Sequence, residues 1–186
     1  MVFRANLRQP QKNAELLIQP NQVNSLKFGQ VVNKKNLTQA GFHYPKDANN
    51  ECYYVPLDKV SAKPAPNILI IDHNRLGLIA IRRGSVQIFS NIKLNDPVGK
   101  VIKAHNTQPN YFVDKYDDGN SKSYHLVYDL PNGNQIDYRM TGGSKMPSDD
   151  IPKQKWNANY AQKLTGTVES IAVGQKATIA LAEGCS

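Results

Sequence analysis

The chain has few of the patterns that identify common function classes. Its 186 residues include only two cysteines and one tryptophan. Neither G-x-x-x-x-G-K-[ST] nor G-x-G-x-x-G occurs, which excludes the common glycine-rich phosphate loops. No apolar run approaches the roughly 18 residues that a transmembrane helix needs. The composition that remains, 40% hydrophobic with frequent tyrosine, favours a β-rich globular domain.

Metal-ligand spacing is also missing. The four histidines are His43, His73, His105 and His125. No two of them have the i, i+4 spacing of a helical metal site, and neither cysteine has a second ligand nearby. The stretch 114–119 lacks suitable calcium ligands at the third and twelfth positions of the loop it would begin. We therefore expect no metal and no cofactor.

Nucleophilic catalysis has no local signature, because G-x-S-x-G does not occur. One enzymatic alternative stays open, a small secreted hydrolase whose site assembles from distant residues such as His125, Asp129 and Asp72. That alternative requires a pocket lined by the three side chains. The main expectation is a non-enzymatic protein that acts by binding.

Positive charge is concentrated in the N-terminal quarter. The formal net charge is +8, and residues 1–46 hold seven Lys/Arg against one acidic residue. Such a surface attracts nucleic acid, anionic lipid or phosphorylated glycan, unless it serves only solubility. The candidate residues for binding an anion or a partner are Lys27, Lys34, Lys35, Arg82 and Arg83.

Nucleic-acid binding is a second alternative. Phe28, Phe42 and Tyr44 lie near the N-terminal basic residues, and basic residues with aromatics can hold single strands. No helix-turn-helix, RNP-like or zinc-finger pattern accompanies them. Nucleic acid is therefore not the partner that we expect.

The cysteines, Cys52 and Cys185, lie far apart in the chain. A disulfide between them would close nearly the whole domain and hold the C-terminal end in place. Two buried thiols are the alternative. We expect the disulfide, and with it an oxidising compartment.

Hydrophobic alternation and turn residues predict the elements. Strands are expected at 15–18, 26–28, 52–57, 68–71, 78–81, 85–89, 92–94, 111–116, 124–130, 135–140, 167–173 and 178–182. One helix is expected from Asn33 to Ala40, with Gly41 after it. A second is expected after an Asp96 N-cap, with Pro97 at its first position. Asn132-Gly133 is typical of a hairpin turn.

A six-residue pattern occurs three times, at 25–30, 91–96 and 170–175. The first two copies precede an expected helix and the third does not, which indicates a repeated unit. The expected fold is α+β: an antiparallel β-rich domain with two short helices, built from repeated strand-turn-helix units. Residues 1–13 are expected to be loose, and 14–186 to form one domain with 14–60 and 67–186 as candidate related halves.

Several short motifs resemble those of bacterial envelope lipoproteins. They are Leu78–Ile81 followed by Asn91–Asp96, Met146–Asp150 followed by Trp156, and Val168–Gly174. The chain is similar in these to the family of envelope-stress (sigma-E) regulated lipoproteins, whose function is unknown. The two cysteines, each preceded closely by a glutamate, also resemble a layout of exported Gram-negative lipoproteins.

The resemblance covers residues 67–175 and implies a location in the periplasm or at the outer membrane. It supplies no catalytic residues. The implied partner is another envelope protein or an anionic glycan. Membrane contact would come only through a lipid anchor that this chain does not carry, and we expect a leader to have preceded it.

Overall fold

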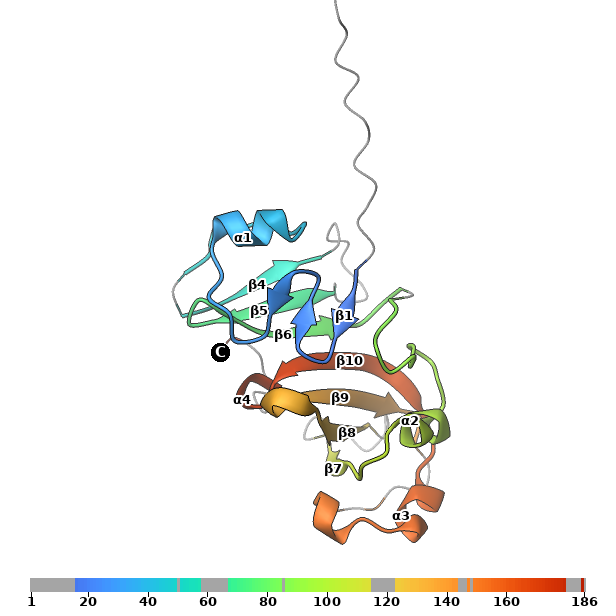
Figure 1. Ribbon diagram of the computed structural model, residues 1–186. Helices are drawn as coiled ribbons and strands as arrows, with labels where there is room; N and C mark the ends of the chain where they lie inside the picture. Colours follow the sequence, from blue (N-terminus) through green and yellow to red (C-terminus); the bar gives the residue numbers. More distant parts are fainter. Residues whose placement is uncertain are drawn as a thin grey trace, which may run out of the picture.

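The computed structural model describes residues 16–49, 51–57, 67–84, 86–114, 123–143, 147, 149–179 and 185. They form two antiparallel sheets, of three and seven strands, with four short α-helices (Figure 1). The predicted α+β class is confirmed. The segment 1–13, expected to be loose, lies outside the described residues, as does most of the stretch 114–119.

The strands are β1 (Ile18–Gln19), β2 (Gln22–Val23), β3 (Leu26–Lys27), β4 (Cys52–Pro56), β5 (Ile68–Asp72), β6 (Arg75–Ile81), β7 (Asn110–Val113), β8 (Tyr124–Asp129), β9 (Asn134–Thr141) and β10 (Thr167–Gln175). The helices are α1 (Lys34–Gln39), α2 (Val98–Ala104), α3 (Ala158–Lys163) and α4 (Lys176–Ile179). Short 3₁₀ turns occupy Pro131–Gly133 and Lys153–Lys155. None of the described helices has the length and apolarity to cross a membrane.

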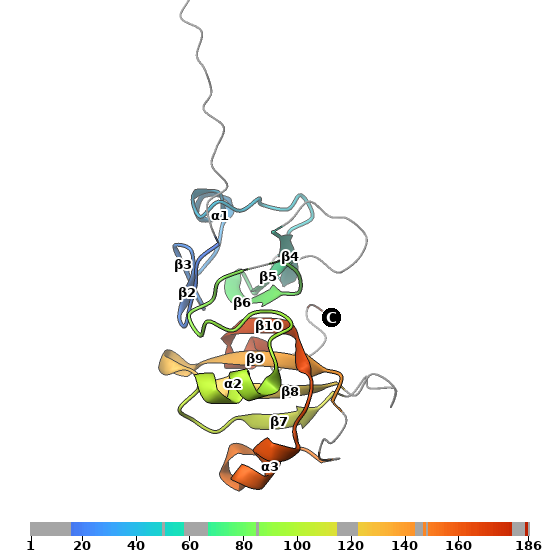
Figure 2. The same cartoon turned by 90° about the vertical axis from the view of Figure 1, so that its right-hand side faces the viewer.

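The large sheet has the strand order β4-β5-β6-β10-β9-β8-β7, and all its pairs are antiparallel. The last strand in the chain, β10, therefore lies in the middle, between β6 and β9. The small sheet (β1 to β3) and α2 lie over one face of the large sheet (Figures 1 and 2). On the opposite face, Ile179 and Cys185 pack over β5 and β6.

Tyrosines make up much of the main core, which lies between the large sheet and the elements over it. Tyr111, Tyr124, Tyr128 and Tyr138 are fully buried. The Tyr111 hydroxyl donates to the Pro147 carbonyl and the Tyr124 hydroxyl to the Thr165 carbonyl, each at 2.8 Å. A buried tyrosine contributes apolar area and still needs a partner for its hydroxyl. These hydroxyls therefore fix neighbouring loops to the sheet.

His105 belongs to the same core, at the end of α2. Its ring stacks on Tyr128 with centroids 3.9 Å apart, and its Nε2 lies 2.9 Å from the Tyr138 hydroxyl. That hydroxyl also contacts the Ser90 Oγ at 2.9 Å. Burial lowers the pKa of His105 to about 4, because the imidazolium would lose its hydration. His105 is thus a neutral core residue at physiological pH.

A smaller cluster on the other face contains the disulfide. Cys52 and Cys185 are bonded, with Cα atoms 5.3 Å apart, and pack with Ile179 on Ile70 and Leu78. The backbone N–H of Cys185 donates to the Tyr54 hydroxyl at 2.8 Å. The predicted disulfide is confirmed, and it indicates an oxidising, extracytoplasmic environment.

Both edges of the large sheet are protected against pairing with another chain. Backbone hydrogen bonds join both ends of β4 to the β5 side of the sheet. In an antiparallel pair every second residue therefore points its backbone N–H and C=O away from the partner strand, and Cys52 and Pro56 are two such residues of β4. The Cys52 N–H donates to Asn49 Oδ1 at 3.0 Å, and Pro56 has no N–H, so neither residue offers a backbone N–H to another strand. On the other edge, Tyr111 of β7 and Ile151 exchange two backbone hydrogen bonds of 2.9 Å. Such devices limit edge-to-edge association.

Several predicted elements are confirmed. The predicted hairpin turn at Asn132-Gly133 joins β8 to β9, with the two residues at φ 67° and 75°. The expected strands 68–71 and 78–81 also form, as the hairpin β5–β6. Helix α1 begins after Asn33, whose side chain accepts the Asn36 N–H in a reciprocal capping box. Gly41 follows at φ 89°, as expected for a residue past a helix end.

Other predicted elements are wrong. Residues 85–89 and 92–94 are not strands among the described residues, although Ile88 and Ile92 are buried. Lys176–Ile179 is a helix where the strand 178–182 was expected, and 180–182 lie outside the described residues. Together α3 and α4 bring the described helices to four, beyond the two short helices expected. The Asp96 carboxylate does not cap α2, because it accepts from the Lys93 N–H and Lys100. Pro97 occupies the N-cap instead of the first helical position.

The repeated unit is not seen in the structure. The segment 25–30 contains the two-residue strand β3, 91–96 is irregular, and 170–175 lies inside the nine-residue strand β10. The one structural feature that the three copies share is that a helix follows each of them. The shared letters therefore do not correspond to one conformation, since tertiary contacts decide the structure of so short a segment.

Removing the disulfide is expected to destabilise the protein strongly. In the chain-entropy account, a bridge between residues 133 apart contributes about 4–5 kcal/mol. The double variant Cys52→Ser/Cys185→Ser should lose this amount in urea unfolding. Reductant should shift the wild-type midpoint to that of the variant and leave the variant unchanged. A wild-type midpoint insensitive to reductant would contradict the prediction.

Acid is expected to destabilise the fold through His105. Its pKa is near 6.5 in the unfolded chain and about 4 in the folded protein, so the unfolded state binds the proton more readily. Stability should fall by up to about 3 kcal/mol as pH drops from 6.5 to 4. His105→Phe keeps the stacking on Tyr128 and should flatten this decline in pH-dependent unfolding. An unchanged slope in the variant would assign the acid sensitivity to other groups.

Candidate functional site

Two predicted binding residues, Arg82 and Arg83, leave the end of β6 and are held there by a buried asparagine. Asn67 is 5% exposed, and its Oδ1 accepts the backbone N–H groups of Arg82 and Arg83 at 2.8 and 3.1 Å. Its Nδ2 donates to the Arg83 carbonyl at 3.1 Å. Three hydrogen bonds from one buried side chain set the direction of the backbone. The backbone that carries the two arginine side chains is therefore held in a fixed position.

The arginines line a concavity of about 500 Å³. Its lining residues are Arg82, Arg83, Gly84, Lys93, Leu94, Asn95, Thr141 and Glu169. They come from the end of β6, the loop before α2, the end of β9 and the first half of β10. We call this the cationic concavity. The end of β6 and the loop before α2 thus bring three cationic side chains to one surface.

The loop that contributes Lys93 is tied to β10. The Asn95 N–H donates to the Val168 carbonyl at 2.8 Å, and the Val168 N–H donates to the Asp96 carbonyl at 2.9 Å. The Val98 N–H donates to the Gly166 carbonyl at 3.0 Å. The wall opposite the arginines is therefore as well supported as the arginine side.

Charges around the concavity are unevenly compensated. Neither Arg82 nor Lys93 makes an ion pair through its side chain with any residue that the structure describes. Glu169 is engaged by Arg139, whose NH1 lies 2.6 Å from Oε2. Lys100 is paired with Asp96 at 2.7 Å. The charges of Arg82 and Lys93 therefore favour an anionic ligand at this surface.

The same contacts affect Asp96. Burial alone would raise the pKa of its carboxyl group. Hydrogen bonds from the Lys100 ammonium and the Lys93 backbone N–H outweigh burial, so the pKa of Asp96 lies below its usual value. Asp96 therefore stays ionised and pairs with Lys100, and its charge also interacts with the nearby Lys93 ammonium.

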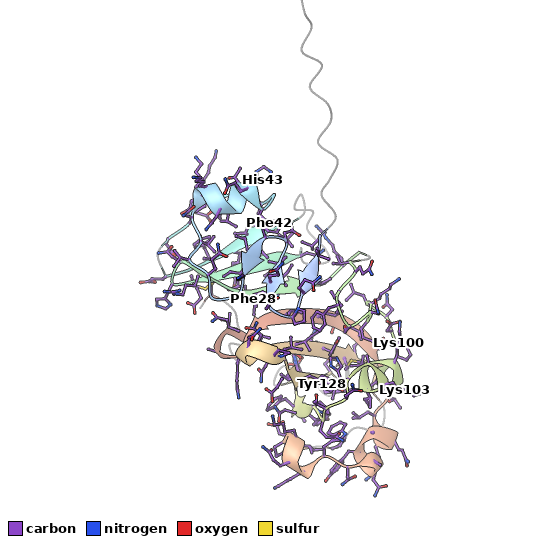
Figure 3. All side chains as sticks on the ribbon, viewed as in Figure 1. Phe28, Phe42, His43, Lys100, Lys103 and Tyr128 are labelled. Carbon is purple, nitrogen blue, oxygen red and sulfur yellow. A yellow bond between two sulfur atoms is a disulfide. The ribbon has the colours of Figure 1, made fainter. Side chains whose placement is uncertain are left out.

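A second hollow, of about 430 Å³, adjoins the first. It is lined by Leu16, Val86, Gln87, Ile88, Asn91, Ile92, Lys93 and Lys100. Lys93 is common to both linings. Figure 3 shows Lys100 on α2, over the face that carries the main core. The two hollows therefore meet at the Lys93 side chain.

The other predicted binding residues lie elsewhere. Lys27 is on β3, and Lys34 and Lys35 begin α1. The backbone next to Lys27 contacts the start of β6, where the Gly29 N–H donates to the Leu76 carbonyl. Arg82 follows the other end of β6, which at 3.3 Å a residue is roughly 20 Å away. The five candidates therefore form two separate groups.

Aromatic residues near the first group offer little surface for stacking. Phe42 is buried in the core and Phe28 is half-buried; both are labelled in Figure 3. Tyr44 is exposed. Tyr44 packs edge-on against Tyr53, with ring centroids 6.1 Å apart. The basic and aromatic residues are close in the sequence, but in the structure the aromatic rings do not form an exposed row on which bases could stack.

The three residues of the hydrolase alternative do not meet. Asp129 is held by Gln135 and Lys153, and Asp72 contacts His73. No hydrogen bond or ion pair among the described residues joins any two of His125, Asp129 and Asp72. Four strand spacings separate β5 from β8, which is roughly 19 Å. One pocket lined by all three side chains is therefore not formed.

His125 instead belongs to a charge network on β8, β9 and β10. Its Nδ1 lies 2.9 Å from Asp137, and Arg139 bridges Asp114 and Glu169 at 2.7 and 2.6 Å. Burial would lower the pKa of His125, but the Asp137 and Asp114 carboxylates outweigh it and raise the pKa above its usual value. The described residues contain no group of three acidic, histidine or cysteine side chains suited to a metal. The network is saturated by its own ion pairs.

Comparisons with protein-family models, curated proteins and solved structures gave no match to the chain. The geometry of the two hollows is therefore the basis for assigning a function. Two of their important residues, Asn67 and Lys93, were not among the predicted site residues. Lys93 is basic and lies in the 91–96 motif, but only the fold places it opposite Arg82.

The arginine support can be tested with Asn67→Ala. This change leaves two N–H groups without their acceptor, and an unsatisfied buried group costs about 1–3 kcal/mol. Unfolding in urea should show a loss of about 2–3 kcal/mol. Asn33→Ala, which removes the exposed α1 cap, is the matched control and should lose about 1 kcal/mol. Equal losses in the two variants would refute a special role for Asn67.

Proposed function

We propose that this chain is a non-enzymatic, exported envelope protein that binds an anionic glycan in the cationic concavity. The observation that carries the proposal is the meeting of Arg82, Arg83 and Lys93 around one hollow. Guanidinium groups form paired hydrogen bonds with phosphate or carboxylate oxygens, and a lysine adds charge.

Several features support a glycan ligand. The concavity is open and shallow, and its lining adds the Asn95 amide and the Thr141 hydroxyl to the cations. Neutral polar side chains beside cations suit a ligand that has hydroxyl groups next to an acidic group. A broad apolar patch, which a protein partner would favour, is absent from the described lining.

Location is part of the proposal. The disulfide indicates an extracytoplasmic environment. The resemblance to sigma-E regulated lipoproteins supports the Gram-negative periplasm or outer membrane as the compartment. Anionic glycans are the abundant polyanions of that compartment, which agrees with the chemistry of the concavity.

Charge reversal tests the binding site. Arg82→Glu and Lys93→Glu should each weaken binding of purified lipopolysaccharide or soluble peptidoglycan fragments by at least about tenfold, which corresponds to about 1.4 kcal/mol. Affinity is measured by titration calorimetry at low and high salt, and wild-type binding should weaken with salt because exposed charges are screened.

Lys34→Glu and Lys35→Glu are the matched controls, because they make the same charge change on exposed residues of α1. They should keep affinity within about twofold of wild type. Equal weakening in all four variants would show that net charge, and not the concavity, governs binding. Full retention of binding in Arg82→Glu and Lys93→Glu would overturn the proposal.

A further inference from the structure

The second hollow has a different chemistry from the cationic concavity. Ile88 and Ile92 form its floor and are 2% and 1% exposed. Leu16 and Val86 are half-buried at its sides and pack against the main core. An apolar floor that continues into the core is rigid and favours a small apolar group.

Two side-chain amides border this apolar floor. Gln87 and Asn91 are exposed, and their amide groups make no hydrogen bond with any residue that the structure describes. A primary amide both donates and accepts. The pair can therefore hold a ligand group that also has one N–H and one C=O.

Charge in this hollow is low apart from the shared lysine. Lys100 is paired with Asp96 at 2.7 Å, and the same carboxylate interacts at longer range with Lys93, which makes no close ion pair with any described residue. Any affinity of this hollow for an anion is thus limited to the position of Lys93, at the boundary with the cationic concavity. The hollow itself suits a neutral group attached close to an anionic one.

We propose that the hollow beside Lys93 binds the acylamino group of an anionic amino sugar, whose charged group lies against Arg82, Arg83 and Lys93. The acyl methyl contacts Val86 and Ile92, and the amide faces Gln87 and Asn91. A volume of about 430 Å³ is sufficient for one substituted sugar ring. This inference rests on the proposed function and names the class of glycan.

Two probes that differ in one substituent test it. N-acetylglucosamine 1-phosphate and glucose 1-phosphate have the same ring and phosphate, but the second has a hydroxyl in place of the acetamido group. Titration calorimetry or NMR titration of the oxidised protein should show on the order of tenfold tighter binding of the acetamido sugar. Equal affinities would overturn the inference.

Variants of the second hollow test whether it causes the preference for the acetamido sugar. Val86→Ser and Gln87→Ala should reduce it to less than about twofold and leave the affinity for glucose 1-phosphate unchanged. Gln162→Ala, an exposed change on α3, is the matched control and should keep the full preference. A preference that persists in both hollow variants would place the acetamido group elsewhere and overturn the assignment.

The two proposals fail in different ways. If the sugars bind equally and Arg82→Glu weakens both, the anion site stands and the acylamino site does not. If Arg82→Glu leaves the affinity for both sugars unchanged, the anion site itself is wrong. If neither sugar binds at millimolar concentration while lipopolysaccharide does, the acylamino class is wrong.

Discussion

The placement of β10 between β6 and β9 is the constraint on which the rest of the structure depends. The approach of β10 to β6 is so close that a Cβ on Gly174 would lie 2.3 Å from the Gly77 carbonyl oxygen. A Cβ on Gly77 would in turn lie 2.7 Å from the Thr178 side chain, at the start of the C-terminal segment. Glycine at these two positions allows one strand to join both parts of the sheet. Main core, disulfide cluster and cationic concavity all border this junction.

The proposed site follows from that junction. Arg82 and Arg83 follow β6, Glu169 lies on β10, and the loop with Lys93 is hydrogen-bonded to Val168 at the start of β10. Residues separated by more than 80 positions therefore form one concave surface. Ion pairs around His125 and Arg139 stabilise the same strands, and Arg139 links them to Glu169 in the lining of the concavity.

Local patterns in the sequence predict the hairpins and α1 because alternation, Asn-Gly and an asparagine cap act over a few residues. Failures occur where distant contacts decide the structure. Ile92 is buried from an irregular loop that β10 holds in place, so its alternating pattern does not give a strand. For the proposed anion site, Arg82 and Arg83 were candidates from the sequence, whereas Asn67 and Lys93 join them only through the fold. The cysteine pairing was predictable because only one intramolecular pairing exists for two cysteines.

The central position of the last strand also determines when the protein can fold. During synthesis β5 and β6 emerge about 90 residues before β10, and their open edge has no partner until then. Domains with such long-range pairing fold slowly and only when the distant strand is available. The large sheet of the nascent polypeptide therefore cannot close before β10 has been made, and a chain with an open sheet is suited to threading through a narrow secretion channel. Sheet closure and oxidation of the cysteines would then follow together on the far side.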